Sequence, residues 1–441
     1  MGNFVDMGNY HQCMGIVHET EDMSIQGKYC HILIPLNQDL EFRLDTRWAG
    51  LDFLSLDVDE DVISKVEEYN LRRSQILASM GVIEHNIKRS AVIPDLGVTL
   101  RLAVCIPKPC STEHAIKSFF FNESDIGFQY QDDFCRLPND KPWSPADTAA
   151  VVVFSTIGVL TLLCTTYDLV YTLVLERDLK ESSRLFTSFS VYTNGRRLMN
   201  FSSAPGTLQC LDGIRTWAMA WVVVGHAFAT ELLLANPIEA IGVWARSLSS
   251  IWILAAPITV DTFFCMGGIL LVYTTVGKMN GAQLIKNLPL FYLNRLLRLF
   301  PLLATAVLLQ ASYFNRMSDG PYWSVVESQT NNCRNNWWVT FLHLQNFVGV
   351  STMCLPHTWY IAIDVQLYII SPIILFWVLG SSRKIAWMAL VGGLMASLMA
   401  ASIYNFINNF PSGTMVLKYQ SLYFGLAQRL YPPLYSSTRT L

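Results

Sequence analysis

The chain has 441 residues, of which 52% are hydrophobic and only 15% are charged. Soluble domains carry about 25% charged residues, so this composition argues against an ordinary soluble domain and indicates a membrane protein. The net charge of −3 argues neither for nor against a polyanionic partner. For a membrane protein of this composition, we expect no nucleic-acid partner.

The first 143 residues are polar and hold five of the ten cysteines. That density predicts a small disulfide-rich domain in an oxidising compartment. Asn122 begins an Asn-Glu-Ser glycosylation sequon, which fits an extracellular or luminal side. Residues 60–80 predict an amphipathic helix, and residues 98–112 predict a strand that runs into a turn. The disulfide candidates here are Cys13, Cys30, Cys105, Cys110 and Cys135.

An odd number of cysteines leaves one without a partner in this domain. The first residues show neither a basic nor an apolar signal region. We therefore expect the chain to begin inside a domain, with a signal sequence and at least one cysteine upstream. A free thiol is the alternative.

Long apolar segments follow this domain. A membrane helix needs about 20 apolar residues, and residues 149–167 contain none that is charged. Ser144, Pro145 and Asp147 precede that run and are typical of a helix start. Five further spans are expected at 213–235, 250–276, 289–313, 357–379 and 385–406. We therefore predict an all-α multi-pass membrane bundle behind a small disulfide-rich N-terminal domain.

The predicted division of the chain has four parts. They are an N-terminal domain (1–143), a first transmembrane helix (144–175), a cytosolic linker (176–210) and a multi-pass membrane domain (211–441). Loops after the odd-numbered spans are richer in lysine and arginine, which places the N-terminal domain outside. Cys333 and Cys354 then lie in an external loop, 314–356, where they can form a disulfide. A second sequon, at Asn200, would be cytosolic and unused.

Several ionisable residues fall within the predicted spans, where they are costly and therefore candidates for function. Arg215 and His226 are eleven residues apart, so they share one helical stripe about 16 Å long. This places Arg215 at the cytosolic edge and His226 near the midplane. Asp261 lies about 16 Å into the third span from the outer side.

Two further sets lie in later spans. His357 stands at the outer end of the fifth span, and Asp364 follows on the same face. Arg295 and Arg298 project from one face of the fourth span near the cytosol. Structural alternatives exist for all of these residues. The histidine can be an interhelical hydrogen-bond partner, the carboxylates partners of a cation, and the arginines interfacial anchors.

The combined pattern suits one chemistry. A carboxylate can orient the imidazole of His226, which then acts as general base on an acceptor hydroxyl. The arginines can hold the phosphates of a donor that enters from the cytosol. Neither zinc-ligand spacing nor a glycine-rich phosphate loop is present, so we expect no metal site.

Four segments resemble the motifs of the type-3 membrane acyltransferase family. "LDGIRTWAMAWVVVGH" is similar to its Arg-x10-His signature, and "VDTFFCMGGILL", "NRLLRLFP" and "HTWYIAIDVQLYIISPIIL" are similar to three later motifs. Asn294 replaces an arginine of the family pattern, and Asp364 replaces a glutamate. The segments "GNFVDMGNYHQCMGI", "GKYC" and "LRLAVCIPKPCS" resemble the N-terminal domain of the nose-resistant-to-fluoxetine branch. The family has more spans than this chain, so we expect truncation at both ends.

The resemblance implies acyl transfer from a cytosolic acyl-CoA to a hydroxyl acceptor reached from the other side. Arg215 and His226 would form the central pair, and Arg295 and Arg298 would serve the donor. No bound cofactor is expected; the implied partners are acyl-CoA, membrane lipids and a hydroxyl-bearing small molecule or lipid. The implied location is the secretory pathway or plasma membrane. One alternative is a non-catalytic carrier of lipids or small hydrophobic molecules, and a weaker one is a receptor module with a membrane anchor.

Overall fold

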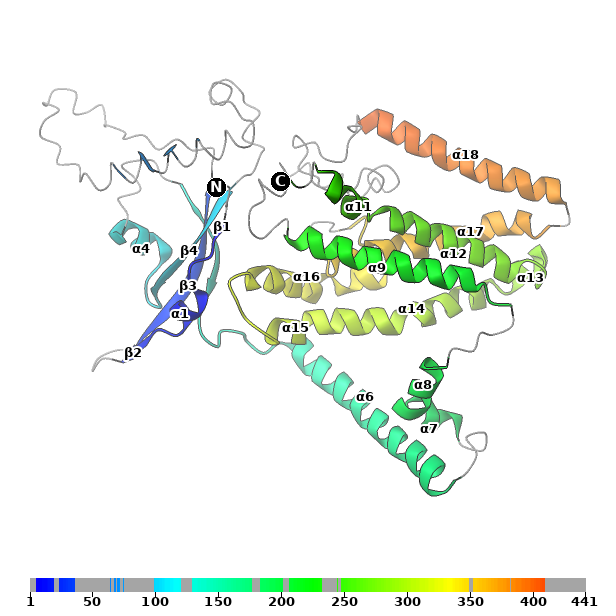
Figure 1. Cartoon of the computed structure of the whole chain (residues 1–441), viewed down its shortest axis with the longest axis horizontal. Helices are drawn as coiled ribbons and strands as arrows, with labels where there is room; N and C mark the ends of the chain where they lie inside the picture. The colour runs from blue at the N-terminus through cyan, green and yellow to red at the C-terminus, as the bar shows by residue number, and fades with distance from the viewer. Residues whose placement is uncertain are drawn as a thin grey trace, which may run out of the picture.

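The structure is a computed structural model that describes residues 5–19, 24–35, 64, 67–68, 70–71, 74, 99–119, 129–176, 183–200, 206–231, 244, 247–348, 352–380 and 382–408. A small sheet domain lies at one end of a helical bundle, and a long helix, α6, runs away from that bundle at an angle (Figure 1). We call the end of the bundle nearest the sheet domain the outer end, and the opposite end the inner end.

The N-terminal domain is built around one long strand, β3 (Ser24–Pro35). Strand β4 (Thr99–Pro107) pairs with it in antiparallel register, and β1 (Val5–Asp6) pairs in parallel with β4. The strands β2 (Val17–Glu19) and β5 (Gln131–Arg136) are also antiparallel to β3. Two short helices, α1 (Tyr10–Met14) and α4 (Thr112–Phe119), complete the domain. The strand predicted at 98–112 is confirmed, whereas most of the helix predicted at 60–80 lies outside the described residues.

Two disulfides connect this sheet domain. Cys13 of α1 is bonded to Cys105 of β4, and Cys30 of β3 is bonded to Cys135 of β5. Cys110 is a free thiol in the described part of the domain. The prediction of a disulfide-rich domain with one unpaired cysteine is therefore confirmed. The sequon at Asn122 lies outside the described residues.

A buried histidine lies at the centre of the sheet. His31 is fully buried, and its Nε2 atom lies 3.0 Å from the hydroxyl of Tyr29, which donates a hydrogen bond to the carbonyl of Met7. Burial, reinforced by the positive charge of Arg101, lowers the pKa of His31 to about 4. The imidazole is therefore neutral at physiological pH.

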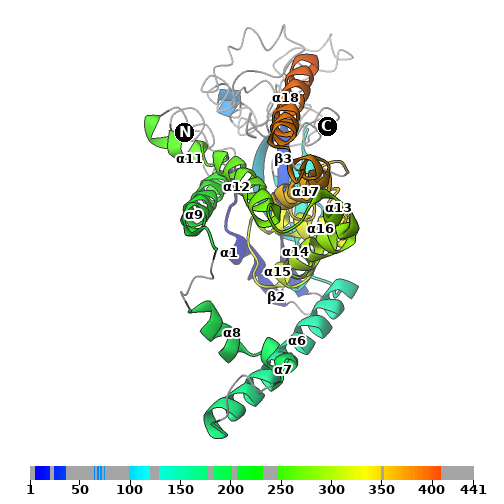
Figure 2. The same ribbon diagram turned by 90° about the vertical axis from the view of Figure 1, so that its right-hand side faces the viewer.

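Helix α6 (Pro145–Leu169) begins where the sequence predicts a helix start, and its first residues form a capping box. The Ser144 side chain accepts from the Asp147 backbone, and the Asp147 carboxylate accepts from the Ser144 backbone. The helix ends in a π-turn, η3 (Val170–Val174). Beyond it, α7 (Arg184–Ser188) and α8 (Val191–Leu198) fold back against its inner end (Figures 1 and 2).

A buried carboxylate holds α8 against α6. Asp168 is fully buried and accepts hydrogen bonds from the hydroxyl of Ser190 and from the backbone and hydroxyl of Thr193. Thr165 adds a further bond, because its hydroxyl accepts from the backbone of Val191. The predicted cytosolic linker is therefore partly helical and attached to the end of the first span.

The remaining helices form the bundle. They are α9 (Gln209–Glu231), η5 (Leu248–Ser250), α11 (Ile251–Leu254), α12 (Ile258–Thr275), α13 (Gly281–Lys286), α14 (Leu288–Ala311), α15 (Tyr313–Arg316), α16 (Trp323–Phe341), η7 (Pro356–Thr358), α17 (Trp359–Val378) and α18 (Arg383–Asn408). Helix α12 lies between α9 and α17, and α18 lies against α17 (Figure 2).

The chain is a multi-pass membrane protein. Five segments among the described residues are long and apolar enough to cross a membrane: 145–174, 248–275, 288–316, 356–378 and 383–407. Five of the six predicted spans are therefore confirmed. The remaining predicted span, 213–235, coincides with α9, which is not one of these five segments. Helix α9 carries the ionisable residues Asp212, Arg215 and His226, and residues 232–235 lie outside the described part of the chain.

The sheet domain docks on the outer end of the bundle through Arg136. This side chain is only 3% exposed and forms ion pairs with Asp319 at 3.2 Å, Glu327 at 2.9 Å and Asp140 at 3.1 Å. Asp319 and Glu327 belong to the loop before α16 and to α16 itself. The predicted external loop, 314–356, therefore lies on the same side as the disulfide-bonded domain, which agrees with the predicted orientation.

Candidate active site

Helix α9 carries both members of the Arg-x10-His pair, and its outer half is tightly docked. The indole nitrogen of Trp221 donates to the carbonyl of Trp252 at 2.6 Å. A Cβ atom on Gly225 would lie only 2.6 Å from the Cβ of Ala256, in the turn between α11 and α12. Only glycine permits this approach. The contact therefore sets the position of His226, the next residue.

His226 lies near the outer end of the bundle. Its imidazole is within electrostatic range of His357, which belongs to the turn η7 just before α17. Within the bundle, the docking of Gly225 against Ala256 at the start of α12 decides the position of His226. Its expected depth near the membrane midplane stays a prediction.

Arg295 and Asp364 are partners. Nη2 of Arg295 on α14 forms an ion pair with Oδ2 of Asp364 on α17. The guanidinium also lies 5.0 Å from the ring centre of Tyr368, in the range of a cation–π contact. The ring of Phe291 stacks on Tyr368 at 4.3 Å, and the hydroxyl of Tyr292 donates to a carbonyl of α17. The pair therefore joins α14 to α17. This is the arrangement expected if Asp364 is the structural partner of a cation.

Tyr360 lies at the centre of the site. It is one helical turn before Asp364, and its hydroxyl is within electrostatic range of Asp364, Arg295 and Arg215. Its ring lies 4.7 Å from that of Phe264 on α12. Its role was not predictable from the sequence, because a tyrosine in an apolar span carries no signal of its own.

The other candidates have weaker contacts. Asp261 is half-buried on α12, and its carboxylate has no hydrogen bond or ion pair with any described residue. Arg215 pairs with Asp212 at 3.5 Å, but both side chains are well exposed, so that pair contributes little. Arg298 is exposed and forms no ion pair within the described part of the chain. Among the candidate site residues that the structure describes, Arg215 and Arg298 are thus the arginines available to an anionic ligand.

Comparison with known proteins indicates the same protein family as the sequence motifs that contain these residues. A family model described as "Acyltransferase domain" matches residues 208–434, more than half of the chain. The chain belongs to this acyltransferase family. A second model, "Nose resistant-to-fluoxetine protein, N-terminal domain", matches residues 1–119. The resemblance found in the sequence motifs is therefore confirmed.

Two relatives show how far the similarity extends. "Nose resistant to fluoxetine protein 6" of Caenorhabditis elegans is 26% identical over 359 residues, which cover 74% of this chain and 43% of the relative. "Putative O-acetyltransferase SACOL0978" of Staphylococcus aureus (strain COL) is 28% identical over 182 residues, 40% of this chain and 26% of the relative. The chain thus spans less than half the length of either relative. No solved structure matches the chain.

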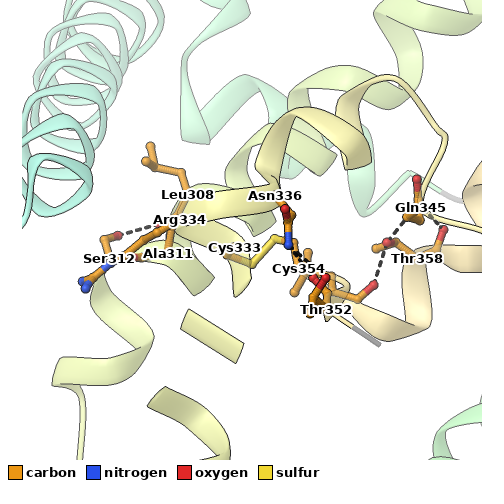
Figure 3. Close-up of a disulfide and its surroundings, with 11 residues drawn as sticks. Leu308, Ala311, Ser312, Cys333, Arg334, Asn336, Gln345, Thr352, Cys354 and Thr358 are labelled. Carbon is orange, nitrogen blue, oxygen red and sulfur yellow. Dashed lines mark hydrogen bonds between the residues drawn. A yellow bond between two sulfur atoms is a disulfide. The ribbon is translucent and has the colours of Figure 1, made fainter. Parts of the chain in front are cut away.

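A disulfide supports the outer end of the candidate site. Cys333 of α16 is bonded to Cys354, three residues before His357 (Figure 3). Both sulfurs are buried in a core with apolar residues of α14. The side-chain amide of Asn336 on α16 donates to the carbonyl of Thr352, two residues before Cys354, at 3.0 Å. The predicted disulfide between Cys333 and Cys354 is therefore confirmed, and it restrains the segment that presents His357.

Hydrogen bonds attach the polar loop that follows α16 to helix α17. The amide of Gln366 on α17 donates to the carbonyl of His343 at 2.8 Å and to the side chain of Asn346 at 2.9 Å. Gln345 donates to the carbonyl of Thr358 at 2.9 Å (Figure 3). These amides were not among the residues predicted from the sequence, although Gln366 lies in the segment that resembles the fourth family motif. No three His, Cys, Asp or Glu side chains come together as a metal site within the described ranges.

Proposed function

We propose that the protein transfers an acyl group from an acyl-CoA on the cytosolic side to a hydroxyl acceptor reached from the outer side. His226 is the general base of this proposal. Arg215 and Arg298 hold donor phosphates, and the Arg295–Asp364 pair keeps α14 and α17 together. The proposed location is the secretory pathway or plasma membrane, with the sheet domain extracellular or luminal.

The observation that supports this proposal is the order of the polar groups along the bundle. His226 and His357 lie at the outer end, and Tyr360 and Asp364 follow within the first turns of α17. Arg215 lies in the inner half of α9. A donor entering from the inside and an acceptor entering from the outside would therefore meet between these groups.

The chemistry requires one proton transfer. The imidazole of His226 takes the proton of the acceptor hydroxyl as its oxygen attacks the thioester carbonyl. The ester C–O bond forms, the C–S bond breaks, and the proton passes to the departing thiolate of CoA. General base catalysis of this kind contributes about 10²- to 10⁴-fold to the rate.

The test is release of CoA from acetyl-CoA by membranes that contain the full-length protein. His226→Ala should lower the rate about 10²- to 10⁴-fold while membrane insertion is retained. His18→Ala, at an exposed position of β2, is the matched control and should keep the wild-type rate. An unchanged rate in His226→Ala would overturn the assignment of the general base.

A second candidate function is non-catalytic binding of a lipid or another hydrophobic molecule. The observation that favours it is an apolar groove of about 840 Å³ between α12, α17 and α18. This function predicts ligand binding that survives His226→Ala and no release of CoA by the wild-type protein.

A further inference from the structure

The apolar groove continues the two helix faces that carry the candidate carboxylates. Gly268, which lines the groove, follows Asp261 by seven residues on α12. Ser371, which also lines it, follows Asp364 by seven residues on α17. Seven residues are two helical turns, so each groove residue shares a face with its carboxylate and lies about 10 Å further inward. The groove and the carboxylates are thus two ends of one interhelical surface.

The groove is apolar and lies at the inner half of the bundle. Along α12 it extends from Gly268 to Val276, which corresponds to about 12 Å. Leu390 of α18 contributes its third side, in agreement with the position of α18 against α17 (Figure 2). Its hydroxyl groups belong to Tyr273 and Ser371, and the other lining side chains are hydrocarbon. Its volume of about 840 Å³ is in the range of small-molecule sites.

We propose that this groove binds the hydrocarbon chain of the acyl donor and thereby selects its length. The thioester would lie beside His226, on the outer side of Asp261 and Asp364, and the chain would extend inward past these carboxylates between α12, α17 and α18. This inference rests on the acyl transfer proposed above. A chain that runs in this direction remains within the membrane leaflet on the side from which the donor enters.

Two adjacent glycines of α12 provide the test. A Cβ atom on Gly268 would meet nothing within 4 Å, so Gly268→Leu should fit without backbone strain and occupy the groove. A Cβ atom on Gly267 also meets nothing within 4 Å, but Gly267 points about 100° away on the helix and does not line the groove. Gly267→Leu is therefore a matched control with the same change in helix propensity.

The measurement is CoA release from acetyl-CoA, octanoyl-CoA and palmitoyl-CoA by membranes that contain the full-length protein or either variant. Each methylene excluded from an apolar site lowers kcat/KM about fourfold. If Gly268→Leu excludes two or more methylenes, the ratio of palmitoyl to acetyl transfer should fall by about tenfold or more. Gly267→Leu should leave this ratio at the wild-type value.

The outcomes separate the two proposals. An unchanged ratio in Gly268→Leu would overturn the groove as the chain site and leave the proposed transfer intact. A wild-type protein that releases CoA from none of the donors would overturn the transfer instead. In that case, crosslinking with a diazirine-bearing palmitoyl-CoA tests whether the groove binds a hydrocarbon chain. Label on peptides of α12 or α17 supports this site, and absence of label there overturns it.

Discussion

Substitution of Gly225 by alanine should displace His226 while leaving the fold intact. The added Cβ would lie 2.6 Å from the Cβ of Ala256, whereas carbon atoms pack at about 3.5–4.0 Å. Ala256 is buried and has no side-chain torsion that can relieve the contact. Helix α9 must therefore move by about 1 Å relative to the start of α12.

The expected effects on stability and activity differ in size. Overpacking costs about 1–3 kcal/mol, but replacing a helical glycine by alanine returns about 1 kcal/mol. The free energy of unfolding should therefore fall by no more than about 2 kcal/mol. A shift of about 1 Å at a catalytic group can lower the rate about 100-fold. CoA release from acetyl-CoA and thermal denaturation in detergent measure the two quantities.

Two further variants make this reasoning refutable. Gly213→Ala lies in the same helix, where a Cβ meets nothing within 4 Å, so it should keep the wild-type rate. Adding Ala256→Gly to Gly225→Ala removes the clash and should restore activity. Full activity in Gly225→Ala alone would show that this contact does not set the position of His226.

Three other predictions concern stability. Replacing Cys333 and Cys354 by alanine opens a bridge over 21 residues and should lower the free energy of unfolding by about 3 kcal/mol, measured by thermal denaturation. The folded pKa of His31, about 4, lies below its ordinary value, so only the unfolded chain gains a proton as pH falls from about 6.5 to 4. Stability should be full above pH 6.5 and fall by up to about 3 kcal/mol by pH 4; His31→Phe should remove this loss. Arg136→Met removes the cation shared by Asp140, Asp319 and Glu327, of which Asp319 keeps its ion pair with Lys141. The change should weaken docking of the sheet domain by about 2 kcal/mol, seen as faster proteolysis at residues 137–144.

For each of these three predictions, one result would contradict the stated reason. An unchanged melting temperature in the cysteine variant would show that packing alone holds the segment before α17. Acid sensitivity that persists in His31→Phe would assign the pH dependence to another group. Proteolysis at the wild-type rate in Arg136→Met would show that the ion pairs do not hold the sheet domain to α16.

Much of the architecture follows from local chemistry. The spans around 149–167, 250–276, 289–313, 357–379 and 385–406 were predictable because a bilayer demands a long apolar run from each helix by itself. The start of α6 was predictable because Ser144 and Asp147 satisfy backbone N–H groups within one turn and Pro145 has no N–H to satisfy. The disulfide candidates of the N-terminal domain were predictable from composition, but their pairing was not, since several connectivities are possible.

By itself, the sequence determined the family and the membrane character through its motifs and long apolar runs. It also determined which residues share a face within each helix, because helical periodicity acts along one segment. Only the tertiary structure decided how the helices are offset against one another. The clash that only Gly225 avoids brings His226 to the outer end, and interhelical packing pairs Arg295 with Asp364 and brings Tyr360 beside them. These offsets depend on side-chain contacts between segments far apart in the chain, and no pattern within one segment contains them.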